Sequence, residues 1–310
     1  VWVTAGTRVF AVALDGTSIL NGAGCDVAGT PASTPAVIDG VAPEVAFVAS
    51  SGGRVWSVKA SAVADGCGTF SPLVDPYVAG PAVDSAGRVL AVSASATPEA
   101  FLRQFTYDGA FAQAWGPVRL GEQLLSQPSV SATDACWIAA DDFGTRSLLE
   151  TSAAGASGVS IDLAGANASA AAVLSDGDLV LSVGSYLRRF SSTGIARWTP
   201  AAPQLGGVGL APLVLDDGVA TTFLVPTRSG TVHLVATDGT VVWSGTLATG
   251  QALGEGNIHT PAGSAFSRAY FTSADGKLHQ VIVDGALDTA APWPKAWHDP
   301  RNTGNAATGF

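Results

Sequence analysis

The sequence is poor in charged residues, and those of positive charge are scattered. Charged residues make up only 13% of the 310 residues, the net charge is −10, and Arg188-Arg189 is the only adjacent basic pair. Nucleic acid and anionic lipid bind clustered positive surfaces, so we expect no nucleic-acid partner. No apolar run reaches the roughly 18–20 residues that a membrane-spanning helix needs, so we expect no transmembrane segment.

Motifs of common enzymes and the pattern of long helices are also missing. We find no zinc motif, phosphate loop, Gly-x-Gly-x-x-Gly fingerprint or Gly-x-Ser-x-Gly elbow. Gly and Pro interrupt the chain so often that no segment keeps a helical apolar period for three turns. Methionine is absent and the first residue is Val1, from which we expect a processed or truncated product, such as one that has lost a signal sequence.

A hairpin phrase recurs along the chain. Its clearest copy spans residues 236–243 and ends at Trp243, and weaker copies end at Trp115 and Trp198. Each copy reads as a strand, an Asp-Gly or Thr-Gly turn, and a second strand that closes on tryptophan. Trp56 falls at an equivalent position, and the periodicity favours packing between repeats over sugar binding by exposed rings.

A second marker gives the length of the repeat. Similar short segments begin at Pro35, Pro81, Pro128, Ala171, Pro212 and Pro261. They are separated by roughly 40–50 residues, which is the length of a four-stranded propeller blade. In the first full unit we expect strands near 35–39, 44–50, 54–60 and 68–74. The pattern predicts an all-β fold, a β-propeller of four-stranded blades.

The number of units predicts seven blades in a single domain, residues 1–310, with six or eight blades as alternatives. Six markers give six units, and the first thirty residues supply most of a seventh that lacks its innermost strand. We expect the C-terminal tail, residues 293–310, to supply that strand, so that pairing of the N- and C-terminal strands closes the ring.

Two of the three cysteines occupy matching places in neighbouring units. Cys25 follows the last strand of the N-terminal unit and Cys67 lies in the same region of the next unit, so we predict a Cys25–Cys67 disulfide. Two unpaired cysteines are the alternative. A disulfide implies an oxidising compartment, namely the periplasm, the cell surface or the exterior. Cys136, in a strand beside Trp137, is predicted to be a buried thiol.

The Asp-Gly-x-x-x-Trp phrase of residues 238–243 resembles the repeat of quinoprotein-like (PQQ-like) β-propellers. The tail resembles the closing segment of bacterial exported and surface proteins with such repeats, which makes Trp293, Trp297, His298, Asp299, Arg301 and Asn302 candidate ring-closure residues. The resemblance implies an exported bacterial propeller, and many members of this family are scaffolds without a quinone. Its dehydrogenases have adjacent disulfide-bonded cysteines and Glu, Asn and Asp calcium ligands, which this chain does not match. We therefore predict no cofactor.

Candidate reactive residues are few. His259 precedes a predicted innermost strand near the mouth of the central channel, where an imidazole can act as a base. The acidic turns that contain Asp176, Asp178, Asp216 and Asp217 are candidate calcium ligands, although Asp is also the residue that hairpin turns favour. No partner group for His259 can be identified in the sequence.

These observations favour a non-catalytic exported β-propeller that binds protein or serves as a structural subunit of a bacterial envelope or extracellular assembly. It would lie in the periplasm, on the outer-membrane surface or outside the cell. The alternative is an enzyme with its site at the channel mouth, either a polysaccharide lyase or hydrolase or a quinoprotein-like dehydrogenase. A pocket around His259 with a second titratable group and an arginine would favour the enzyme.

Overall fold

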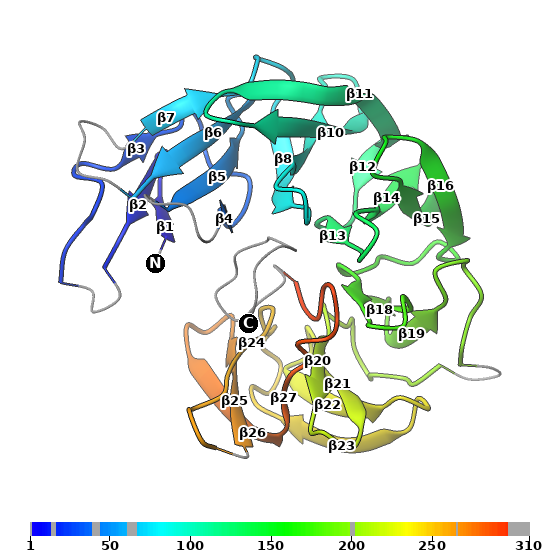
Figure 1. Ribbon diagram of the computed structural model, residues 1–310. Coiled ribbons are helices and arrows are strands. Elements are labelled where there is room, and N and C mark those ends of the chain that lie inside the picture. Colours follow the sequence, from blue (N-terminus) through cyan, green and yellow to red (C-terminus); the bar gives the residue numbers. More distant parts are fainter. Residues whose placement is uncertain are drawn as a thin grey trace.

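The computed structural model describes residues 2–13, 17–38, 44–60, 67–198, 202–264 and 266–296, and these form seven antiparallel sheets and no helix. The sheets follow one another in chain order around a common centre (Figure 1). The all-β prediction is therefore confirmed. None of the described residues belongs to a helix that could cross a membrane.

The first sheet contains β1 (Trp2–Ala5), β2 (Arg8–Ala11) and β3 (Cys25–Asp26). The second contains β4 (Ala36–Ile38), β5 (Val45–Ser50), β6 (Arg54–Lys59) and β7 (Cys67–Phe70). The third contains β8 (Tyr77–Val83), β9 (Val89–Ala94), β10 (Ala100–Tyr107) and β11 (Phe111–Gly121). The strands β4 to β7 match the four strands predicted for the first full unit.

The next two sheets contain β12 (Gln123–Leu124), β13 (Ser129–Val130), β14 (Cys136–Asp142), β15 (Thr145–Thr151) and β16 (Ser157–Asp162); and β17 (Ala172–Val173), β18 (Leu179–Val183) and β19 (Tyr186–Phe190). The last two contain β20 (Leu213–Asp216), β21 (Thr221–Pro226), β22 (Thr231–Ala236), β23 (Val241–Thr246) and β27 (Ala286–Leu287); and β24 (Asn257–His259), β25 (Phe266–Thr272) and β26 (Leu278–Asp284).

Most of the repeat markers stand where an innermost strand begins, and two do not. Pro81 lies inside β8, which is an edge strand of its sheet, so the missing N–H disrupts no interior ladder. Pro261 follows β24 instead of opening it, so the predicted last inner strand is shifted toward the N-terminus. As a result His259 lies within this strand rather than ahead of it.

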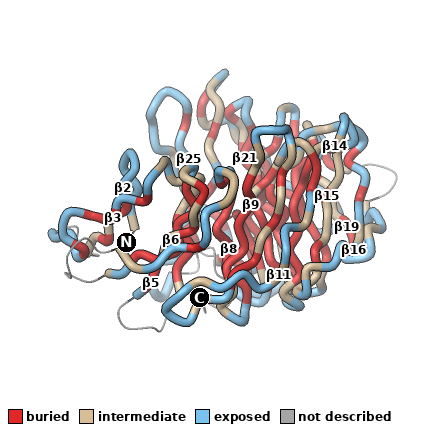
Figure 2. Tube along the Cα trace, turned by 90° about the horizontal axis from the view of Figure 1, so that it is seen from above, coloured by how far each residue is buried: buried red, intermediate tan, exposed pale blue. Residues whose placement is uncertain are grey.

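The hydrophobic core lies between sheets that are neighbours in the chain. One buried cluster joins the first two sheets, another joins the β4–β7 sheet to the β8–β11 sheet, and further clusters link the following pairs. Buried residues run along β8 and β9, whereas the outer strands β11 and β16 are largely exposed (Figure 2). Each sheet is therefore stabilised mainly by contacts with the sheets that are next to it in the chain.

Two of the repeat tryptophans dock on the following sheet, as predicted. The Nε1 of Trp115 donates a hydrogen bond to the carbonyl of Ala153 at 3.2 Å, and that of Trp198 donates to Thr237 at 2.9 Å. Each ring covers the glycine two residues after that carbonyl, where a Cβ would lie within 3.2 Å of the ring. These glycines also have positive φ. The same glycine therefore allows the hairpin turn and leaves room for the tryptophan ring.

The other two repeat tryptophans behave differently. Trp56 packs on Phe70 of the adjacent strand, with 4.7 Å between ring centroids, and also against the buried cluster that joins the first two sheets, so its predicted packing between repeats is confirmed. Trp243 is 43% exposed and lies against Gly245 of its own strand, so the predicted packing between repeats is wrong for Trp243. Trp115 and Trp198 dock on the turn before the outermost strand of the next sheet. In the sheet that follows Trp243, β27 pairs with β20 and not with β26, so the described residues form no equivalent turn there.

The segment after β27 returns to the centre of the ring (Figure 1). Trp293 pairs with Val173 of β17, and its carbonyl accepts a 2.8 Å hydrogen bond from the Val173 N–H. Pro294 accepts a similar bond from Val214 of β20. Trp293 thus lies at the edge of the β17 sheet.

The remaining ring-closure candidates, Trp297, His298, Asp299, Arg301 and Asn302, lie outside the described residues. Within the described residues the β1–β2–β3 sheet has three strands, and no buried cluster joins it to the β24–β26 sheet. The closing of the ring by the two chain ends stays a prediction.

The predicted Cys25–Cys67 disulfide is present. It joins β3 of the first sheet to β7 of the second, the outermost strands of neighbouring sheets. Cys136 is free and buried, as predicted, and burial raises the pKa of its thiol.

Candidate binding cavity at the centre of the ring

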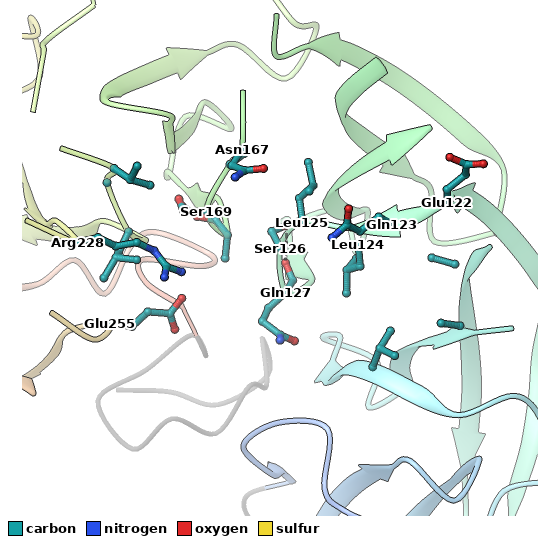
Figure 3. A pocket seen from close by; sticks show the side chains of 18 residues that line it. Glu122, Gln123, Leu124, Leu125, Ser126, Gln127, Asn167, Ser169, Arg228 and Glu255 are labelled. Atoms are coloured by element: carbon teal, nitrogen blue, oxygen red, sulfur yellow. Dashed lines mark hydrogen bonds between the residues drawn. The ribbon is translucent and has the colours of Figure 1, made fainter. Parts of the chain in front are cut away.

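A cavity of about 800 Å³ opens among the connecting segments that precede the innermost strands. Residues 122–127 lead toward β13, residues 167–170 lead toward β17, and residues 208–210 lead toward β20. Arg228, from the turn between β21 and β22, and Glu255, from the segment before β24, also line the cavity (Figure 3). Val78, Ala94 and Ala100 of the β8–β11 sheet complete the described lining. Five consecutive sheets thus contribute residues to one site.

Charged and amide side chains are distributed along this cavity. Arg228 and Glu255 lie together at one end, and Glu122 lies at the opposite end (Figure 3). Between them are Asn167 and Gln127, and the Gln127 Oε1 accepts a 3.0 Å hydrogen bond from the Gly80 N–H. The site therefore offers hydrogen-bond donors and acceptors as well as charges of both signs.

The two serines of the cavity hold its loops in place. Ser126 Oγ accepts a 2.9 Å hydrogen bond from the Ala139 N–H, and Ser169 Oγ accepts one at 3.0 Å from the Ser182 N–H. A nucleophilic serine needs a neighbouring base, and no histidine is among the described lining residues. These hydroxyls therefore fix the backbone around the cavity.

Aliphatic side chains make up the rest of the wall, among them Leu124, Leu125, Val208 and Leu210. No aromatic residue is found among the lining residues that the structure describes. An aliphatic wall with a few polar groups is typical of sites that bind a ligand through contact area and fix its orientation through hydrogen bonds.

The predicted candidate His259 does not belong to the cavity. It is an exposed residue of β24, opposite Arg268 in the sheet register, and it is not among the lining residues. Arg268 is the arginine opposite His259, and the cavity brings together a different pair, Arg228 and Glu255. The structure does not bring them together with the histidine into one site.

The four candidate calcium ligands lie in two separate hairpin turns. Asp216 and Asp217 cap the β20–β21 turn, where Asp217 accepts hydrogen bonds from Val219 and Ala220, and these bonds hold the pKa of its carboxyl below the usual value. The described residues contain no group of three or more His, Cys, Asp or Glu side chains placed to hold a metal ion.

Asp176 and Asp178 belong to an ion-pair cluster in the β17–β18 turn. Asp178, 3% exposed, binds Arg189 and Arg197 at 2.9 Å each, and Asp176, 53% exposed, binds Arg189 at 2.7 Å. Arg189 also donates to the Thr237 carbonyl, which accepts from the docked tryptophan. The cluster therefore ties one sheet to the next.

We expect Asp178→Ala to lower the free energy of unfolding by about 2 kcal/mol, because two guanidinium groups lose a buried partner and one of them stays half-exposed to water. Asp176→Ala is the matched control, with an expected loss below about 1 kcal/mol because its ion pair is solvated. Urea unfolding followed by circular dichroism measures both. Equal losses for the two variants would contradict the structural assignment.

The cavity residues Glu122, Arg228 and Glu255 were missed by sequence reasoning. They come from connections without a motif, and only the ring brings them together. The one usable signal is position in the repeat. Glu122 and Glu255 precede an inner strand, and Arg228 lies in the turn after the second strand of its repeat. Both positions lie at the same end of the ring.

Comparison with known proteins shows the fold and not the family. No protein-family model matches the chain. No curated protein matches its sequence either. Solved structures do resemble it. A functionally unknown protein from Desulfotomaculum acetoxidans DSM 771 is 13% identical, covers 92% of this chain and 99% of its own, and gives a TM-score of 0.56.

Two further structures have similar levels of identity. BBS1N, solved in complex with ARL6DN, is 14% identical over 84% of each chain with a TM-score of 0.54. BamB from Moraxella catarrhalis is 14% identical over 91% of this chain and 95% of its own with a TM-score of 0.48, too low to add to the assignment. The first two likenesses, together with the arrangement of sheets, define a β-propeller-like fold.

Proposed function

We propose that the protein is a non-catalytic binding subunit whose partner is another protein and whose binding surface is the end of the ring that holds the cavity. The observation that carries this proposal is the composition of the cavity. It has aliphatic area, amides and an arginine, but neither a histidine nor an available serine nucleophile among its described residues. Groups of this kind recognise a surface rather than transform a substrate.

The fold supports the same proposal. Connections from several sheets converge on one end, so the cavity can be surrounded by a broad contact surface while the sheets stay rigid. BBS1N, which shares the fold, was solved in complex with ARL6DN, which is an example of a chain of this shape that binds a protein.

We further propose that the seven sheets are the blades of one ring, a single domain over residues 1–310 that is closed by the two chain ends. Among the described residues the β1–β3 sheet has three strands, and such a closure would supply its inner strand. The Cys25–Cys67 disulfide supports export to the periplasm, the outer-membrane surface or the exterior, where such bonds persist.

Site-specific photo-crosslinking in the source organism tests the binding surface. A photoreactive amino acid replaces Val208, a 43% exposed cavity residue, and the control replaces Val219, which is 94% exposed in the β20–β21 turn. This turn lies at the other end of β21 from Arg228. We expect one protein to be crosslinked in high yield from position 208 and not from 219. Equal yields from both, or none from either, would refute the proposal.

A further inference from the structure

We infer that the cavity holds an extended peptide segment of the partner, with aliphatic side chains along Leu124, Leu125 and Leu210 and an acidic side chain at Arg228. This inference rests on the proposed function and names the chemistry of its ligand. Three properties of the cavity support it, namely its shape, the chemical nature of its wall and the placement of its charges.

The shape suits an extended chain. The cavity runs from Arg228 and Glu255, contributed by the last two sheets, to Glu122 beside the β14 strand of an earlier sheet (Figure 3). A site this elongated can contact several successive residues of a peptide, whose side chains point alternately to opposite sides.

The wall suits a peptide better than a sugar or a nucleobase. Those ligands present flat or weakly polar faces that stack on aromatic rings. The described lining instead offers leucine and valine side chains with amides between them. Aliphatic side chains of a peptide bury apolar area against such a wall, and backbone amides pair with Asn167 and Gln123, both exposed members of the lining.

The charges give the peptide a preferred composition. Arg228 is exposed and forms no ion pair with any described residue, whereas Glu255 beside it already interacts within the protein. A guanidinium group presents a donor fork that matches a carboxylate. Arg228 therefore favours an acidic side chain or a C-terminal carboxylate of the peptide at this end of the cavity.

Selection from a phage-displayed library of random peptides tests this inference on the full chain. We expect the enriched sequences to combine aliphatic residues with an acidic one. Synthetic copies should bind about tenfold more weakly to Arg228→Glu in fluorescence anisotropy, a change typical of a lost charge pair. Lysine in place of the acidic residue should restore binding to Arg228→Glu.

Arg268→Glu is the matched control, because Arg268 is an exposed arginine of β25 outside the cavity, and it should leave peptide affinity unchanged. Affinity that is indifferent to Arg228→Glu, or no enrichment over an unrelated target, would overturn the peptide inference. Crosslinking at Val208 without an Arg228-dependent peptide would leave the proposed function standing and reject only its ligand. Arg228-dependent peptide binding without crosslinking at Val208 would support the peptide chemistry of the cavity and reject the protein partner of the proposed function.

Discussion

Loss of the Cys25–Cys67 disulfide should lower the free energy of unfolding by about 4 kcal/mol. The bond closes a loop with a sequence separation of 42 residues, and in the chain-entropy model such a closure removes about that much disorder from the unfolded chain. The double variant Cys25→Ser/Cys67→Ser and the reduced wild-type protein should shift the urea midpoint by similar amounts.

The remaining thiol does not confuse this measurement. Cys136 is buried and its pKa is raised, so little reactive thiolate is present to exchange with the bond or with the reductant. Because the disulfide joins only the first two sheets, hydrogen exchange should accelerate in β1–β3 before any other sheet. A double variant within about 1 kcal/mol of wild type would show that packing between these sheets suffices.

Trp293→Ala should have an effect of similar size, about 4 kcal/mol, because it removes one of the largest buried side chains. Trp293 is 1% exposed and packs in the largest core cluster, between sheets that are distant from it in sequence. Truncation of such a residue leaves a cavity and loses the transfer free energy of the ring.

Trp243→Ala is the matched control for Trp293→Ala, since it removes the same side chain from a 43% exposed site on β23, an edge strand of its sheet. We expect it to change the free energy of unfolding by less than about 1 kcal/mol. Circular dichroism is the suitable probe, because fluorescence changes when either tryptophan is removed. Similar losses for the two variants would mean that residues 286–296 are not anchored to β17 and β20.

Local chemistry made much of the fold predictable. The Asp-Gly turns set the hairpins, and the tryptophans at positions 115 and 198 were correctly assigned to contacts between repeats, since both the ring and its glycine are encoded in the repeat. The Cys25–Cys67 pairing followed from equivalence of position. These features depend on contacts within one repeat or between adjacent repeats.

The features that escaped prediction depend on where the chain goes after the last repeat and on how loops converge. The route of β27 to β20 and of Trp293 to Val173 is decided by tertiary packing at the ring centre, for which a repeat pattern has no signal. Likewise, Arg228 and Glu122 are far apart in sequence and share a cavity only because one end of the ring gathers their connections.

The buried clusters that join successive sheets have a consequence for how this architecture can change over evolutionary time. Each cluster joins sheets that are neighbours in the chain, so duplication or deletion of a whole repeat would create a single new contact between sheets and leave the other contacts intact. Two of these contacts are built in the same way, with a tryptophan ring over the turn glycine of the next sheet, so the same docking arrangement serves different pairs of sheets. Adding or removing a whole sheet at such a contact would disturb less of the core than a change inside one sheet.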